Sequence, residues 1–159
     1  MGEPPSPTPA ATALPSSPDA PVVVGADAQD DVAVDVDRWV ALAAAALASE
    51  GRRGELTLTF VDRDEIAALN AEHLGTTGPT DVLSFPLDMR GPLPDGVPRQ
   101  LGDVVICPAV AAAQGTPIEH LLVHGALHLL GYDHEADEGE MLARQELIVQ
   151  EIAHAARPA

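Results

Sequence analysis

The stretch that most constrains the fold is HGALHLLGYDH, which runs from His124 to His134. His124 and His128 are four residues apart, so on a helix their imidazoles project from one face, about 6 Å apart along the axis. A helix that continued through His134 would rotate that residue by about 80° and carry it about 15 Å from His124. Gly131 readily adopts the positive φ that ends many helices. The spacing therefore predicts a helix that ends near Leu130 and a turn that returns His134 to the other two histidines.

Three convergent imidazoles indicate a metal site. Neutral imidazole is a common zinc ligand, and three protein ligands that leave one coordination position open are typical of catalytic zinc. We therefore predict that His124, His128 and His134 bind one Zn²⁺ ion. His120 lies one turn before His124 on the same face, where it could orient a ligand, contact substrate or remain solvated.

The residue after His124 is Gly125, and it bears on the reaction. The same histidine spacing occurs in metzincin zinc proteases, H-E-x-x-H-x-x-G-x-x-H, where glutamate follows the first histidine and acts as general base. Glycine cannot transfer a proton, and amide hydrolysis needs one for the leaving amine. Phosphodiester cleavage can proceed by attack of a metal-bound hydroxide or of a neighbouring 2′-OH, with the metal stabilising charge on phosphoryl oxygens. Gly125 therefore disfavours a metallopeptidase-like hydrolase without excluding it.

The composition limits the partners of the chain. Eight arginines and no lysines oppose 25 acidic residues, so the formal net charge is −17. Such a surface repels nucleic acid at long range, so RNA binding requires a local site or a partner that presents the RNA. The single cysteine, Cys107, excludes an intramolecular disulfide and is expected to be buried. Without a secretory signal or a membrane-spanning stretch, we expect a cytoplasmic protein that binds neither membrane nor DNA.

The chain divides into a tail and one domain. Residues 1–20 contain six prolines and predict a disordered tail, whereas 21–159 are expected to form a single domain. The last helix should bury an apolar face made of Met141, Leu142, Leu147, Ile148 and Ile152. Strands and helices intermix, which predicts an α+β fold with one small, mostly four-stranded mixed sheet flanked by helices. The expected strands are 21–26, 55–62, 79–88 and 101–108, and the expected helices are 38–50, 63–73, 108–114, 117–130 and 137–155.

Three segments together resemble the bacterial YbeY family of metal-dependent endoribonucleases. HGALHLLGYDH resembles the family pattern H-G-x-x-H-L-x-G-Y-D-H. GPTDVLSFP at 78–86 resembles P-T-[DN]-V-L-S-F-P, and LGDVVICP at 101–108 resembles L-G-D-[IV]-x-[IL]. Their order and spacing also agree, so the resemblance covers roughly residues 21–155.

This resemblance implies a zincin-like α+β fold in which His124, His128 and His134 are the zinc ligands. It implies a single-strand-specific endoribonuclease that acts in late 16S rRNA 3′-end maturation and in ribosome quality control. The implied partners are precursor rRNA and ribosomal particles or ribosome-associated proteins.

One position departs from the family pattern. Many members have an arginine before the glycine of R-G-x-x-x-P-T-[DN]-V, where this chain has Leu74. Arg63, Arg90 and Arg99 are candidates to replace that basic contact with RNA. Leu74 and the negative charge also leave open a non-catalytic, metal-stabilised module that binds ribosomes.

Overall fold

The computed structural model describes residues 21–87, 99–132 and 139–155. The predicted tail at 1–20 and the predicted ligand His134 lie outside these ranges. All the predicted strands and helices are confirmed, with differences of a few residues at their ends; residue 88 of the third strand and residues 137–138 of the last helix lie outside the described ranges. Along the chain they are β1 (Val22–Asp27), α1 (Val36–Ser49), β2 (Glu55–Phe60), α2 (Arg63–Leu74), β3 (Val82–Pro86), β4 (Gln100–Ile106), α3 (Pro108–Gln114), α4 (Ile118–Leu129) and α5 (Glu140–Ala155).

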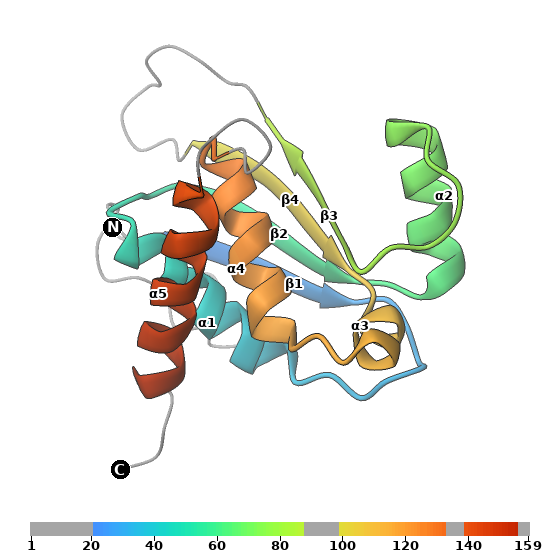
Figure 1. The fold of residues 1–159 in the computed structure, drawn as a ribbon, viewed down its shortest axis with the longest axis horizontal. Helices are drawn as coiled ribbons and strands as arrows, with labels where there is room; N and C mark the ends of the chain where they lie inside the picture. Colours follow the sequence, from blue (N-terminus) through green and yellow to red (C-terminus); the bar gives the residue numbers. More distant parts are fainter. Residues whose placement is uncertain (1–20, 88–98, 133–138, 156–159) are drawn as a thin grey trace, which may run out of the picture.

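The strands form one mixed sheet in the order β1-β2-β4-β3 (Figure 1). β1, β2 and β4 run parallel to one another, and the edge strand β3 runs antiparallel to β4. The expected α+β fold with a four-stranded mixed sheet is thus confirmed. The antiparallel edge strand lies beside α4, the helix that carries His124 and His128.

Helices α1 and α4 cover one face of the sheet, whereas α2 packs beside a smaller cluster on the other. Leu56, Leu58 and Phe60 alternate along β2 and are fully buried on the face covered by α1 and α4. α5 packs against α1 and α4. On the opposite face, Ile66 of α2 packs in a smaller cluster that includes the buried Cys107. No helix in the described ranges has both the length and the apolar character needed to span a membrane.

The predicted apolar face of α5 is partly wrong. Met141, Ile148 and Ile152 are buried, but Leu142 and Leu147 are 52% and 54% exposed. At about 100° per residue, Leu142 and Leu147 lie roughly 100° and 120° from Met141, on opposite flanks of the buried stripe. α5 contacts α1 and α4 through that narrow stripe, so the two leucines remain outside the core.

Candidate metal centre

α4 brings the first two predicted ligands together. The rings of His124 and His128 lie 4.7 Å apart between centroids, at an interplanar angle of 79°. The helix ends at Leu129, and Gly131 has a φ of 103°, as the sequence predicted. The pair therefore presents two imidazoles on one face of α4, whereas the position of the third predicted ligand is outside the described residues.

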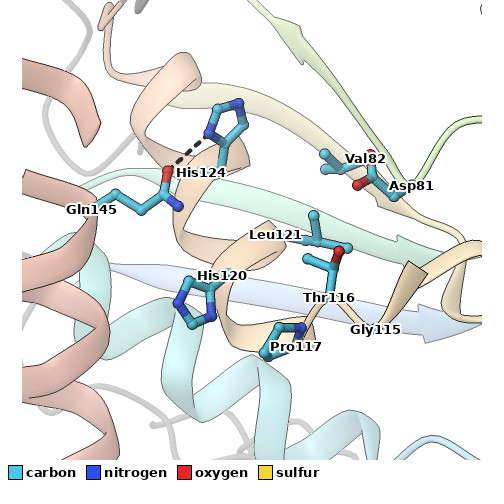
Figure 2. Close-up of a pocket in the computed structure, with 9 residues that line it drawn as sticks. All are labelled: Asp81, Val82, Gly115, Thr116, Pro117, His120, Leu121, His124 and Gln145. Atoms are coloured by element: carbon cyan, nitrogen blue, oxygen red, sulfur yellow. Dashed lines mark hydrogen bonds between the residues drawn. The ribbon is translucent and has the colours of Figure 1, made fainter. Parts of the chain in front are cut away.

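Both rings are oriented through Nδ1. His128 Nδ1 lies 3.1 Å from the carbonyl oxygen of Tyr132, and His124 Nδ1 lies 2.8 Å from Oε1 of Gln145 (Figure 2). Each oxygen accepts a hydrogen bond, so in the neutral rings Nδ1 carries the proton and Nε2 keeps the lone pair that binds a metal. This donor chemistry fits a metal ion. Among the described residues no group of three or more His, Cys, Asp or Glu side chains is arranged around a metal, and His134 is not one of those residues.

Gln145 was not found by sequence reasoning, because it lies on α5, 21 residues from the ring that it orients. We expect Gln145→Leu to weaken zinc binding by about 10–100-fold, the usual cost of losing a group that orients a ligand. Competition with a chelating dye would measure the affinity. Gln145→Glu, which keeps an acceptor, should restore much of it. Gln150→Leu makes the same change at an exposed position of α5, so equal affinities for the two leucine variants would contradict this role.

Gly125 faces the sheet rather than solvent. A Cβ atom at this position would lie 2.7 Å from Cγ1 of Val104 and 3.1 Å from Oγ of Ser84. The Ser84 hydroxyl donates a hydrogen bond of 3.2 Å to the carbonyl oxygen of Gly125. Glycine thus permits α4 to approach β3 and β4 closely, and a glutamate would have to displace Val104. The missing protease glutamate reflects this packing, and Ser84 of the TDVLSFP segment takes part in it.

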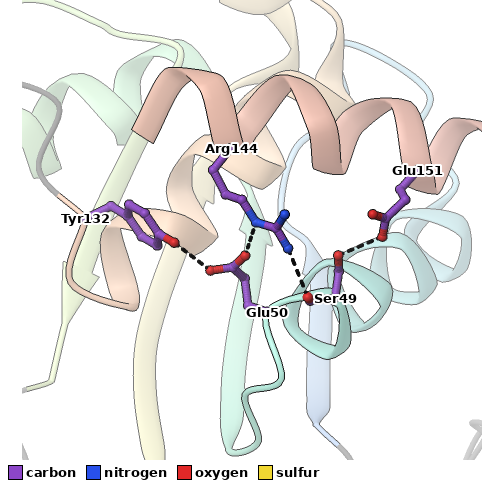
Figure 3. A network of polar contacts seen from close by, with 5 residues as sticks. All are labelled: Ser49, Glu50, Tyr132, Arg144 and Glu151. Atoms are coloured by element: carbon purple, nitrogen blue, oxygen red, sulfur yellow. Dashed lines mark hydrogen bonds and ion pairs between the residues drawn. The ribbon is translucent and has the colours of Figure 1, made fainter. Parts of the chain in front are cut away.

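A polar network ties the turn after α4 to two other helices (Figure 3). The Tyr132 hydroxyl donates to Oε1 of Glu50 at 2.8 Å, and Arg144 of α5 forms an ion pair with Oε2 of the same carboxylate. Arg144 also donates to the carbonyl oxygen of Ser49 at 3.0 Å. The hydrogen bond to Glu50, together with burial, raises the pKa of the Tyr132 phenol, so the phenol remains a donor. Since the Tyr132 carbonyl orients His128, the network holds that ring as well.

We expect Arg144→Met to lower the free energy of unfolding by about 2 kcal/mol, a typical loss for a hydrogen bond to a charged group. The side chain of Glu50 is only 11% exposed, so its carboxylate would lose its cation with little water to replace it. Urea denaturation of the metal-free chain would measure the change. Arg52→Met removes an equal charge from an exposed position, and an equally large loss there would contradict a specific role for the ion pair.

An open cleft of about 380 Å³ lies beside His124, between α4, α5 and the start of β3 (Figure 2). His120, whose role the sequence left open, is one of the residues that line it. Its Nε2 lies 3.5 Å from Oε2 of Glu146, while its Nδ1 is buried without a hydrogen-bond partner in the described part of the chain. The lining consists of Asp81, Val82, Gly115, Thr116, Pro117, His120, Leu121, His124 and Gln145.

The position of the family arginine carries no charge here. Leu74 is the last residue of α2 and is 59% exposed. Arg63, the first residue of that helix, lies about 16 Å away along its axis and donates to the carbonyl oxygen of Ala109 at 3.3 Å. Arg63 therefore does not occupy the place of the side chain at 74. Arg99 directly precedes β4, and Arg90 lies outside the described residues.

The sheet, the helix packed across it and the oriented histidine pair define an α+β protein with a candidate histidine metal centre. The model of the family described as Endoribonuclease YbeY matches residues 26–153. The chain belongs to this family, which confirms the resemblance seen in its sequence.

Individual relatives agree with the family match. An Endoribonuclease YbeY of Halorhodospira halophila is 52% identical over 95 residues, covering 55% of this chain and 62% of the relative. One from Methylococcus capsulatus is 47% identical over 112 residues, covering 64% and 72%. The solution structure of TM1509 from Thermotoga maritima matches with a TM-score of 0.53 and 26% identity, over 84% of this chain and 90% of that one. The chain thus spans about three fifths of the length of the Halorhodospira relative.

Proposed function

We propose that this chain is a zinc-dependent endoribonuclease that cleaves single-stranded RNA. The observation that carries the proposal is the oriented pair His124–His128 in a chain of the YbeY endoribonuclease family. His134 would be the third ligand of one Zn²⁺ ion. We further propose that the reaction takes place in the cytoplasm, on the 3′ end of 16S rRNA in ribosomal particles, during late maturation and quality control.

The proposed roles follow from the contacts of each side chain. A zinc ion at this position would supply a Lewis acid that stabilises the negative charge developing on a phosphodiester. Gln145 and the Tyr132 carbonyl hold the two imidazoles, so little reorientation is needed when RNA binds. Gly125 takes no part in proton transfer, and its packing against Val104 leaves no room for the glutamate that amide hydrolysis would require. This argues against a metallopeptidase.

The proposal is tested by cleavage of a precursor 16S rRNA 3′ fragment with the zinc-loaded chain. We expect cleavage of the single-stranded fragment, loss of cleavage with a chelator, recovery with zinc, and little cleavage of the same sequence in a duplex. His124→Ala, prepared in parallel, controls for contaminating nuclease. Equal cleavage by both preparations would contradict the proposal.

A ribosome-binding module without activity is the second candidate, favoured by the exposed Leu74 and the charge of −17. The same assay with intact ribosomal particles separates the two. Binding of particles by a zinc-loaded chain that leaves their RNA intact would support the module and contradict the nuclease.

A further inference from the structure

We propose that the cleft beside His124 is a nucleobase subsite that selects a base with an exocyclic amino group, next to the scissile phosphate. The inference rests on the proposed ribonuclease function and deepens it, because it names the part of the substrate that the cleft binds.

The position and size of the cleft suit one nucleotide. His124 belongs both to the cleft and to the predicted zinc ligands, so a base bound here adjoins the phosphate at the metal. The volume of about 380 Å³ falls at the small end of the range for ligand pockets, about 300–1,000 Å³. The side chains of Val82 and Leu121 form an apolar part of the wall, and this surface suits the flat face of a heterocycle.

The charge of the cleft favours an uncharged group over a phosphate. Asp81 places a carboxylate in the lining of the cleft. Neither lysine nor arginine occurs among the described residues that line it. An anion would face this carboxylate without a compensating cation and within a strongly acidic chain. The cleft therefore suits the neutral base of the nucleotide, while the phosphate lies toward the metal.

The hydrogen-bonding groups favour a ligand that donates. Asp81 presents carboxylate oxygens, which accept only. The His120 ring also lines the cleft, but its Nε2 faces Glu146 at 3.5 Å and its Nδ1 is buried, so Asp81 supplies the acceptor oxygens that a ligand in the cleft can reach. Adenine, cytosine and guanine carry an exocyclic NH₂ group that can satisfy such acceptors, whereas uracil has a carbonyl oxygen at the corresponding position.

Hydrogen bonds fix the backbone and the side chain of Asp81 at the edge of the cleft. The Asp81 carbonyl accepts a hydrogen bond of 2.9 Å from the Cys107 amide, which attaches the start of β3 to the end of β4. The Thr80 hydroxyl lies 3.4 Å from Oδ1 of Asp81. Figure 2 shows the Gln145 amide nitrogen directed away from His124, so this nitrogen adds a donor for the ring acceptors of a base.

The test is a titration of the ¹⁵N-labelled, zinc-loaded chain with 2′-O-methylated trinucleotides UCU, UAU and UUU, followed by NMR. Methylation blocks attack by the 2′-OH, and recovery of intact trinucleotide after the titration would show that binding is measured apart from cleavage. We expect UCU or UAU to bind about tenfold more tightly than UUU and to shift the signals of Thr116 and of the Gln145 side-chain amide. Equal affinities for the three trinucleotides, no binding, or shifts elsewhere on the chain would overturn the proposal.

One variant and a matched control assign the preference to the cleft. Asp81→Asn should reduce the tenfold preference to about twofold or less, because the amide replaces one acceptor oxygen by a donor. Asp30→Asn removes the same charge from an exposed position outside the cleft and should keep the full preference. A preference that survives Asp81→Asn would overturn the subsite. Cleavage of rRNA without base preference would contradict only the subsite, whereas a base preference without cleavage would contradict only the nuclease.

Discussion

Replacement of His124 by alanine is expected to reduce RNA cleavage by more than about 100-fold and to abolish stoichiometric zinc binding. Loss of a group that merely orients a ligand typically costs about 10–100-fold, so loss of the ligand should exceed this range. His128→Ala should behave alike, because the two rings lie 4.7 Å apart and would bind the same ion. Initial cleavage rates and metal content, measured on the same preparations, test both variants.

His73→Ala provides the control for these histidine variants. His73 is on α2, its side chain is 47% exposed, and it is not among the predicted ligands. It should retain zinc and activity. If His128→Ala kept the zinc content of the unmodified chain, the ligand assignment would be wrong, whatever happened to the cleavage rate.

Gly102→Ala is expected to lower the free energy of unfolding by about 4 kcal/mol, a large part of the 5–15 kcal/mol typical of whole domains. Gly102 has a φ of 133°, and a Cβ there would lie 2.3 Å from the carbonyl oxygen of Phe85. The backbone strain and the forced separation of β3 from β4 each contribute about 1–3 kcal/mol. Urea denaturation would measure the loss if the variant is soluble, and pulse proteolysis would detect the unfolded chain if it is not.

Gly75→Ala is the matched control for this prediction. Gly75 also has a positive φ, 69°, but beyond its chain neighbours no described residue lies within 4 Å of the position of its Cβ. Only the conformational cost remains, about 1–2 kcal/mol. Equal losses in the two variants would show that the close approach of β3 and β4 at Gly102 is not decisive.

Local sequence determined much of the helix that carries the site. The four-residue spacing of His124 and His128 placed both rings on one face because the helical repeat is 3.6 residues. Gly131 marked the end of the helix because it tolerates a positive φ. The segments around β3 and β4 also carry the family resemblance in their residues alone, and the family match agrees with it.

The tertiary structure decided what surrounds that helix. Gln145 orients His124 from 21 residues away, and Arg144 meets Glu50 across 94 residues; no local pattern encodes either contact. The prediction for the two flanks of α5 was wrong for the same reason. Hydropathy alone does not specify how much of the surface of α5 is covered by α1 and α4. Sequence periodicity specifies which residues share a face, whereas the packing of α4 against β3, β4 and α5 specifies what that face meets. For that reason the two histidines follow from the sequence, and the groups that hold them and form the adjoining cleft follow only from the fold.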